Sequence, residues 1–359
     1  MPLTLATPHW LATSPRTGLG GLRLAGDRPL SAAAKSGVAI LALAWLCCHA
    51  GQAKAQPDAE GPAPGRSAPQ GQDVRPAVMP AAVPPLPDLS DTPVSLLRRL
   101  QSSGEWVAGG QGVWRGWWLP VPVTSKAPAV MLLHGCNGAL DAQGRVSLRP
   151  LDYAALLQRE GWHVMVLDSF TPRGLKEICT QKLAGRSVTP ADRALDVAQA
   201  LGWLASQPTV DAERLAIVGW SNGGSTVLSS VDASQQVGQS LWPKAAVAFY
   251  PGCGSRALRR FDPRSALLVM SGALDDWTPA EPCRQAMQRA AAQWPSRVLS
   301  YVEYEGAYHG FDGTGEVKVR ADVPNGVNPG QGVHVGGRAP SRQASRLQLM
   351  DFLRQQLSR

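Results

Sequence analysis

The segment Leu215–Gly223, with the sequence LAIVGWSNG, decides the fold that this chain predicts. Its first four residues are apolar in succession, which is typical of a strand buried on both faces of a sheet. The next five read Gly-Trp-Ser-Asn-Gly and lead into small residues with helical spacing. A tight strand-to-helix turn leaves little room, so Gly219 and Gly223 allow close backbone packing while Ser221 is pushed out at the edge of the sheet. The alternative interpretation is a packing turn of small residues.

Apolar runs of strand length alternate with segments of helical period from Trp106 onward. The predicted strands cover residues 129–133, 162–167, 215–218, 245–249, 266–270 and 298–304. The predicted helices cover residues 151–160, 190–206, 221–230, 279–293 and 341–357. We therefore expect an α/β fold with a mostly parallel central sheet, helices on both of its faces, and ligands at the carboxyl ends of the strands. Residues 114–123 are expected to add leading antiparallel strands.

The composition excludes a fully disordered chain and a coiled coil, because 44% of the 359 residues are hydrophobic and 17% are charged. The formal net charge is +8, but half of this excess lies in the first 55 residues, which contain five Lys or Arg and one Asp. The other half is spread along the chain without a run of five basic residues. We therefore expect no nucleic-acid partner.

Residues 35–56, KSGVAILALAWLCCHAGQAKAQ, have the pattern of a secretory signal. A cation precedes an apolar run over 38–48, and Ala53 and Ala55 supply the small residues of a cleavage site. The run is shorter than the roughly 20 residues that a membrane span needs. We expect residues 1–55 to be a cleaved leader and the protein to be exported, periplasmic or extracellular, with no stable membrane span. An uncleaved anchor is the alternative.

The rest of the chain divides into two parts of different composition. Residues 56–93 are rich in Pro and Ala and hold too few large apolar residues to offset the entropy of ordering, so they predict a disordered linker. Residues 94–359 contain all the predicted strands and helices. No internal repeat occurs in them, and they predict a single catalytic domain.

Ser221 needs a base and an acid, because a serine hydroxyl is a weak nucleophile until an oriented base accepts its proton. Asp275 lies in GALDDWTP directly after a predicted strand, and His309 lies in YHGF after the last one. The chain order Ser, Asp, His is the order of α/β-hydrolases. Asp276 is the competing acid, for which a helix cap or a solvated carboxylate is the expected role.

Two backbone amides are candidates for an oxyanion hole. They are the N–H of Asn222, directly after the predicted nucleophile, and the N–H of Cys136 in the loop HGCNG. A plain strand-ending turn is the alternative for that loop. His134 is expected to hydrogen-bond the loop, and His163, inside a strand, to pack in the core. No metal-ligand spacing and no dinucleotide motif occurs, so we expect neither a metal nor a cofactor.

Four cysteines lie beyond the predicted leader, and export would permit their oxidation. Four cysteines allow three pairings. The predicted topology puts Cys136 and Cys179 after neighbouring strands, and Cys253 and Cys283 after another neighbouring pair. We therefore expect a disulfide within each pair, with four free buried thiols as the alternative.

The motifs HGCNG, DSFTPRG, GWSNGG, FYPGC, GALDDWTPAEPC and GAYHGFD occur in this order from about Leu97 to Arg359. With them the chain resembles the dienelactone hydrolase family of α/β-hydrolases, and especially its exported, cysteine-containing members. The resemblance implies a serine hydrolase that cleaves an ester or lactone through an acyl-enzyme, with Ser221, Asp275 and His309 as its triad. It also supports the two disulfides. The name-giving enzymes use a cysteine nucleophile and a nearby glutamate, so the resemblance does not imply turnover of dienelactone itself.

The resemblance also suggests residues that contact the substrate. Members of the family bind a substrate carboxylate with arginines, and Arg173 in TPRG is the corresponding candidate; a solvated loop arginine is the alternative. Trp220 and Trp277 flank two predicted catalytic residues and are candidates to line an acyl site, with simple packing as the alternative. The Gly-rich segment 313–341 is long for a loop with little structure, which makes it a candidate wall of the pocket.

Two other functions stay open on the sequence alone. A peptidase of the prolyl-oligopeptidase type shares this catalytic domain, but it carries a large accessory domain, for which residues 56–113 are too short and too rich in proline. A catalytically silent hydrolase fold that binds a partner at the cell envelope is the second alternative. The presence of all three triad residue types argues against it.

Overall fold

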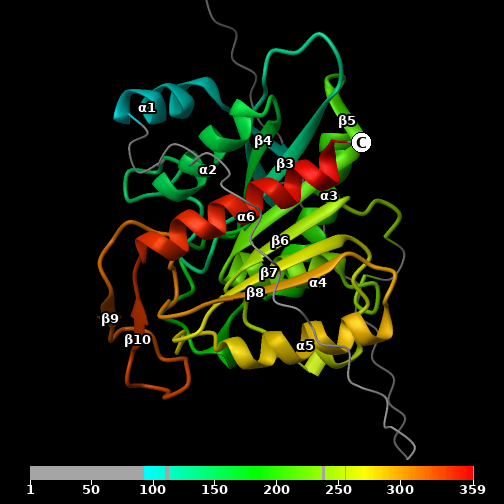
Figure 1. Ribbon diagram of the computed structural model, residues 1–359. Helices are drawn as coiled ribbons and strands as arrows, with labels where there is room; N and C mark the ends of the chain where they lie inside the picture. Colours follow the sequence, from blue (N-terminus) through cyan, green and yellow to red (C-terminus); the bar gives the residue numbers. More distant parts are fainter. Residues whose placement is uncertain (1–92, 110–112, 237–238, 255, 359) are drawn as a thin grey trace, which may run out of the picture. The chain divides into compact units, whose positions relative to one another are not determined.

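A single mixed sheet of eight strands lies at the centre of the computed structural model (Figure 1). The structure describes residues 93–109, 113–236, 239–254 and 256–358. The predicted leader, and the whole of the predicted linker except Pro93, lie outside these residues. The strands follow one another across the sheet in the order β1-β2-β4-β3-β5-β6-β7-β8.

The direction of the strands agrees with the sequence pattern. The strands are β1 (Glu105–Gly109), β2 (Trp114–Leu119), β3 (Ala127–Leu133), β4 (His163–Asp168), β5 (Val210–Trp220), β6 (Ala245–Phe249), β7 (Ala266–Gly272) and β8 (Leu299–Tyr304). β1 pairs with β2, and β2 with β4, in antiparallel fashion, whereas the remaining neighbours are parallel. The expected mostly parallel sheet with leading antiparallel strands is confirmed.

Helices cover both faces of this sheet (Figure 1). They are α1 (Val94–Ser103), α2 (Leu148–Arg159), α3 (Pro190–Ala205), α4 (Asn222–Val231), α5 (Ala280–Gln293) and α6 (Ala339–Leu357). α1, α2 and α6 pack on one face, and α3, α4 and α5 on the other. α1 was not predicted from the sequence. None of the helices among the described residues has the length and apolarity needed to cross a membrane.

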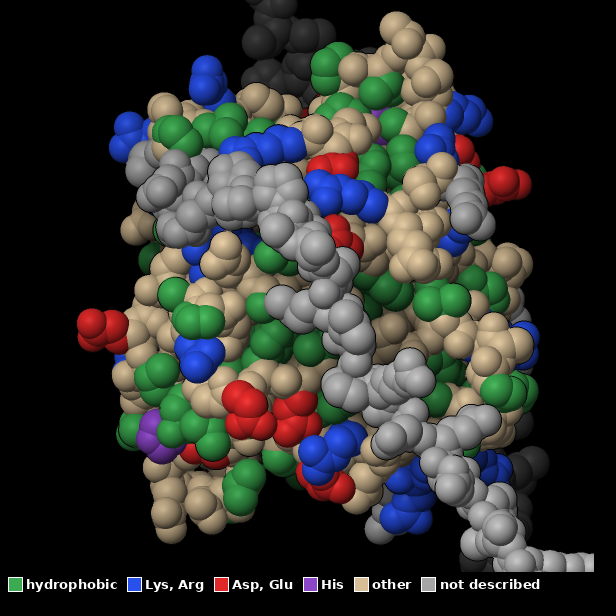
Figure 2. All heavy atoms as spheres, viewed as in Figure 1, with side chains coloured by type: hydrophobic (Ala, Val, Ile, Leu, Met, Phe, Trp, Pro, Cys, Tyr) green, Lys and Arg blue, Asp and Glu red, His purple; other side chains and the backbone are tan. Residues whose placement is uncertain are grey.

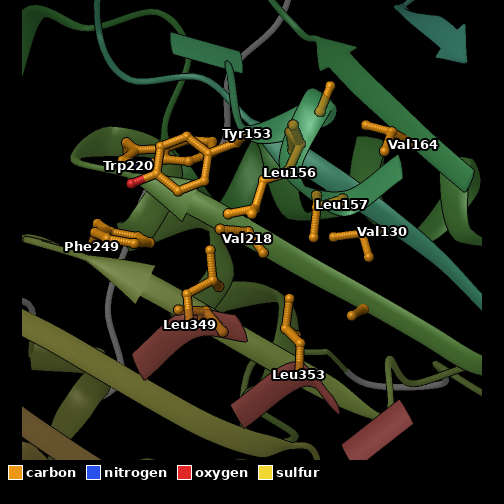
Figure 3. Close-up of a cluster of buried hydrophobic side chains, with 14 of the residues drawn as sticks. Val130, Tyr153, Leu156, Leu157, Val164, Val218, Trp220, Phe249, Leu349 and Leu353 are labelled. Carbon is orange, nitrogen blue, oxygen red and sulfur yellow. The ribbon is translucent and has the colours of Figure 1, made fainter. Parts of the chain in front are cut away.

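The apolar runs of the strands supply side chains to both faces, because successive residues of a strand point to opposite sides. Val130 and Val218 belong to the cluster that includes α2 and α6, whereas Met131 belongs to the cluster with α3, α4 and α5. In Figure 3, Leu349 and Leu353 of α6 point toward the strands that carry Val130 and Val218. Each such buried side chain contributes about 1.5–3 kcal/mol, so α6 is held chiefly by its apolar contacts.

Charged side chains of both signs are interspersed on the face shown in Figure 2. Arg354 of α6 pairs with Glu160, at the end of α2, at 2.7 Å. A surface ion pair of this kind contributes about 0–1 kcal/mol, which is less than one buried leucine. This ion pair therefore contributes less to the stability of α6 than the apolar contacts of the helix do.

The Gly-rich segment 313–341 has more structure than the sequence indicated. It contains two short antiparallel strands, β9 (Lys318–Arg320) and β10 (Val333–Val335). The N–H of Val327 donates to the carbonyl of Asp276 at 2.8 Å, which ties the segment to the loop after β7. Strands of three residues give no readable alternation, and so the local pattern did not reveal them.

Two glycines bring the start of α4 into direct contact with β5 and with β3. A Cβ atom on Gly219 would lie 2.3 Å from the carbonyl oxygen of Gly223, and one on Gly223 would lie 2.1 Å from the carbonyl oxygen of Leu133. Both distances are far below van der Waals contact, and the opposing atoms are backbone. Only glycine fits at these two positions without moving a strand or a helix.

Gly219→Ala is expected to lower the free energy of unfolding by about 1–3 kcal/mol or more, because the methyl group overpacks against backbone. Gly202→Ala is the matched control, because a Cβ at Gly202 in α3 meets no atom within 4 Å. The control should raise the free energy of unfolding by about 0.5–1 kcal/mol, since alanine favours a helix. Urea unfolding followed by circular dichroism measures both; equal stabilities for the two variants would contradict the close approach.

Candidate active site

The loop after β3 and the elbow after β5 meet at one edge of the sheet. β3 and β5 pair in parallel, with Leu133 opposite Gly219. From β3 the chain continues to β4 on one side, whereas from β5 it continues to β6 on the other side. The strand order therefore changes direction between β3 and β5. Open α/β sheets bind their ligands at the carboxyl ends of the strands at such a switch point.

Ser221 occupies the elbow in a backbone conformation that residues other than glycine seldom adopt, with φ 55° and ψ −116°. Its N–H donates to the carbonyl of Phe249 at 2.9 Å, which fixes the turn to the end of β6. The residue stands between β5 and the first turn of α4. This strained turn is what the G-x-S-x-G motif predicted.

The imidazole of His309 links the serine to an acid. Its Nε2 lies 3.0 Å from Ser221 Oγ, and its Nδ1 lies 2.8 Å from Asp275 Oδ2. The His309 and Asp275 residues are 3% and 4% exposed, so little water competes for these contacts. The structure therefore brings together the three side chains that the sequence singled out, in the geometry of a Ser–His–Asp triad.

Thr278 is a member of this network that the sequence analysis did not single out. Its hydroxyl lies 3.0 Å from Asp275 Oδ2, 3.1 Å from His309 Nδ1 and 3.0 Å from the carbonyl oxygen of Tyr250. The backbone N–H groups of Trp277 and Thr278 donate to Asp275 Oδ1 at 2.9 and 2.8 Å. The available signal was the Thr-Pro pair three residues after Asp275, a spacing at which an aspartate accepts hydrogen bonds from the following turn.

The competing carboxylate, Asp276, faces the other way. Its Oδ1 accepts a hydrogen bond from the backbone N–H of His334 at 2.9 Å, and its Oδ2 lies 2.6 Å from His334 Nδ1. The N-cap of α5 is Pro279, so Asp276 does not cap that helix. Asp276 instead holds the segment that contains β9 and β10.

The two amides expected to form an oxyanion hole have no hydrogen-bond acceptor within the part of the chain that the structure describes. They belong to Asn222, the first residue of α4, and to Cys136 in the loop after β3. Both residues line cavities that contain Ser221. A helix start also carries a partial positive charge, which favours an anion beside Asn222.

Both expected disulfides are present in the structure, with the expected pairing: Cys136–Cys179 and Cys253–Cys283. The first braces the loop that carries the Cys136 amide, and the N–H of Ile178 donates to the Cys136 carbonyl at 2.8 Å. The second joins the loop after β6 to α5.

Arg193 lies beneath the elbow and was not identified from the sequence. It is fully buried in α3, and its Nη1 donates to Asn222 Oδ1 at 2.5 Å. Burial lowers the pKa of Arg193 to about 9, although the charges of Asp196 and Asp168 act in the opposite direction. The contact joins residues 29 apart, and no local sequence pattern reports such a pair.

His134 has the structural role expected of it. Its Nδ1 lies 2.8 Å from the carbonyl oxygen of Gly135, and the N–H of Ser169 donates to its Nε2 at 3.4 Å. Burial, with the nearby charge of Arg193, lowers the pKa of His134 to about 3, so the ring stays neutral in the folded protein. His163 is also buried, and its ring nitrogens contact backbone atoms of Val121 and Thr209.

Two cavities meet at Ser221. The larger has a volume of about 490 Å³ and lies on the side of Asn222 and the Cys253 loop. The smaller has a volume of about 190 Å³ and includes His309 in its wall. Cys136, Ser221 and Trp277 line both cavities. Ser221 is thus open on two sides.

The two candidate tryptophans have different positions. The ring of Trp277 lies 4.6 Å from the His309 ring, centroid to centroid, and this residue lines both cavities. The Trp220 ring packs between Tyr153 and Phe249 in the hydrophobic core (Figure 3). Trp220 is only 2% exposed, so the packing alternative holds for its side chain, although the residue borders the smaller cavity.

Arg173, the suggested substrate contact, does not line either of these two cavities. Its guanidinium makes two hydrogen bonds of 2.8 Å to the carboxylate of Asp196 and donates to the carbonyl oxygens of Val113 and Ser169, both at 2.7 Å. These bonds raise the pKa of Arg173 and use its donors within the protein. It ties the loop after β4 to α3.

The position of the nucleophile elbow at the switch point of a mostly parallel sheet defines the class of protein, an α/β-hydrolase. Residues 118–323, more than half of the chain, match the model of the dienelactone hydrolase family, and the chain belongs to this family. The resemblance seen in the motifs is thereby confirmed. The protein is a carboxylic ester hydrolase.

Solved structures similar to this chain include a putative dienelactone hydrolase from Klebsiella pneumoniae, which is 20% identical with a TM-score of 0.48 over 67% of this chain and 92% of that one. Another is esterase 2 of Thermogutta terrifontis, phosphoramylated by tabun, which is 16% identical with a TM-score of 0.47 over 70% of this chain and 93% of that one. No curated protein matches the sequence.

His134 gives the stability of the fold a defined pH dependence. In the unfolded chain its pKa is near 6.5, whereas in the folded protein it is about 3, so between these values only the unfolded state binds the proton. The contribution of His134 to the free energy of unfolding is therefore fully present above pH 6.5 and falls by about 1.4 kcal/mol per pH unit as the pH drops toward 3.

His134→Gln should remove that part of the slope when urea unfolding is measured from pH 7.5 to 4.5. Part of the slope should persist in the variant, because burial also lowers the pKa of His163. Identical slopes for wild type and variant would show that His134 does not stay neutral in the folded state.

Proposed function

We propose that Ser221, His309 and Asp275 act as the catalytic triad of this hydrolase and cleave a carboxylic ester or lactone through an acyl-enzyme. The observation that carries the proposal is the His309 imidazole, which lies 3.0 Å from the serine oxygen on one side and 2.8 Å from a buried carboxylate on the other. A base held between its nucleophile and an orienting acid is the arrangement that nucleophilic catalysis by serine requires.

In the first step, His309 Nε2 takes the proton of Ser221 as the serine oxygen attacks the substrate carbonyl. The N–H groups of Asn222 and Cys136 then donate to the oxyanion of the tetrahedral intermediate. His309 returns the proton to the leaving oxygen, the carbon–oxygen bond breaks and an acyl-serine remains. Water, deprotonated by His309, attacks the acyl group; the bond to Ser221 Oγ breaks, His309 returns the proton to that oxygen, and the acid is released. Asp275 keeps the Nδ1 proton in place throughout.

We also propose that the enzyme works after export, in the periplasm or outside the cell. The predicted signal in residues 1–55 supports this location. Two disulfides in a chain of this size are further support, because they persist in oxidising compartments.

Ser221→Ala is expected to abolish hydrolysis of short aryl esters and labelling by a fluorophosphonate probe, because the attacking oxygen is removed. The melting temperature measures whether the fold survives, and it should stay close to that of the wild type. An alanine variant that still hydrolyses esters, or a wild-type enzyme that the probe does not label, would rule out Ser221 as the nucleophile.

The two adjacent aspartates offer a matched test of the acid. Asp275→Asn should lower kcat about 10³- to 10⁴-fold, because an amide no longer holds the catalytic tautomer of His309. Asp276→Asn should leave kcat near the wild-type value, because Asp276 contacts His334 and not His309. Steady-state kinetics on one aryl ester compares them. A similar loss in both variants would mean that Asp275 acts only through local structure.

A further inference from the structure

A third cavity continues the site on the side of His309. It has a volume of about 520 Å³ and is lined by residues from the start of α2 and from the segment around β9 and β10. It shares Asn137, Arg149, Gly310 and Val335 with the cavity of about 190 Å³. That cavity in turn shares Ser221 with the one of about 490 Å³. The three cavities are therefore successive parts of one groove, with Ser221 between its two arms.

The position of His309 decides which arm takes which part of an ester. His309 must protonate the leaving oxygen, so the alcohol has to leave along the cavity that His309 lines. His309 lines the cavity of about 190 Å³ but not the one of about 490 Å³. The acyl group therefore occupies the larger cavity at Asn222, and the alcohol extends past His309 and Arg149 toward the third cavity. This assignment rests on the proposed catalytic roles.

The acyl arm is lined mainly by apolar groups. Pro190, Pro279, Pro282 and the Trp277 ring are in its wall, and Arg186 is the charged residue among its lining side chains. Its volume is in the range of pockets that hold drug-sized ligands. An acetyl group would leave most of it unfilled, whereas an aromatic or medium-length alkyl acyl group would bury its apolar surface there.

The alcohol arm has a more polar lining than the acyl arm. Arg149 and Lys318 line it together with Asp152 and Glu316, so both signs of charge occur along it. Four glycines of the segment 313–337 also line this arm, so little side-chain bulk narrows it there. A ligand of one charge would meet repulsion as well as attraction in this arm. Hydroxyl groups both donate and accept hydrogen bonds, and so match such a lining.

Arg149 lies where the small cavity opens into the third one. Its Nε is 3.5 Å from Asp312 Oδ2, and the carboxylate of Asp312 also accepts hydrogen bonds from the buried hydroxyls of Tyr153 and Tyr250. A Cβ at Gly313 would lie only 3.2 Å from Arg149 Nη2, so the absence of a side chain there leaves room for the guanidinium. Asp312 thus holds Arg149 in place where the two cavities adjoin.

We propose that the natural substrate is an ester that joins an apolar acyl group, aromatic or alkyl, to a large hydroxyl-rich alcohol such as a sugar. The acyl group would fill the arm at Asn222 and the alcohol would extend past Arg149. Binding on both sides of the scissile bond holds the carbonyl carbon against Ser221, and this positioning raises kcat/KM for the extended ester.

Three probes with matched parts test this substrate class on the wild-type enzyme: methyl 3-phenylpropanoate, the 3-phenylpropanoyl ester of maltose at a primary hydroxyl, and the acetyl ester of maltose at the same hydroxyl. The second probe fills both arms, and each of the others fills one. We expect its kcat/KM to exceed that of each of the other two by roughly tenfold or more.

Three glycine-to-tryptophan variants assign the two arms. Gly315 lines the alcohol arm and Gly254 the acyl arm, and a Cβ at either meets no atom within 4 Å. Gly315→Trp should lower the ratio of kcat/KM for the maltose ester over the methyl ester toward one. Gly254→Trp should lower the ratio for the 3-phenylpropanoyl over the acetyl ester of maltose. Gly202→Trp, on α3 and outside every part of the groove, is the control and should change neither ratio.

The outcomes separate the substrate class from the catalytic mechanism. Equal kcat/KM for the three probes, or a Gly315→Trp variant that slows the methyl and maltose esters by the same factor, would overturn the inference and leave the triad standing. Hydrolysis of none of the probes, together with no fluorophosphonate labelling of Ser221, would overturn the proposed function and the inference with it.

Discussion

The contact between the start of α4 and the end of β3 is the constraint on which the rest of the site depends. Gly223 brings its Cα so close to the Leu133 carbonyl that no side chain fits between them. This contact sets the distance between the start of α4 and the loop after β3, and each of these carries one of the two amides proposed to stabilise the oxyanion. The strained φ of Ser221 persists because β5, β6 and α4 fix the backbone on both sides.

The elements that were read correctly from the sequence are those with strong local patterns. The parallel strands appear as unbroken apolar runs because both faces of the sheet are covered. The elbow could be predicted because its tight turn requires the two glycines of the motif. Asp275 and His309 could be proposed because loops after strands converge at one edge of such a sheet. The cysteine pairs followed from the same reasoning.

What the sequence did not reveal depends on contacts between distant residues. Nothing in the residues next to Arg173 distinguishes it from a solvated arginine in a surface loop. Only the fold brings the Asp196 carboxylate to it. Arg193 beneath Asn222 and Thr278 beside the triad are likewise defined by their partners. The strands β9 and β10 are too short for a readable period. Asp276, which was expected to cap a helix or to be solvated, holds them instead.

The disulfide at Cys136 also makes the structure of the site depend on whether the chain has been oxidised. The proposed nucleophile, base and acid are positioned by the packing of strands and helices, whereas the loop with the Cys136 amide is additionally held by a bond whose formation needs an oxidant. A newly made chain in a reducing environment would carry the serine without this covalent brace on the neighbouring loop. The loop with the Cys136 amide would then gain this brace only where thiols are oxidised.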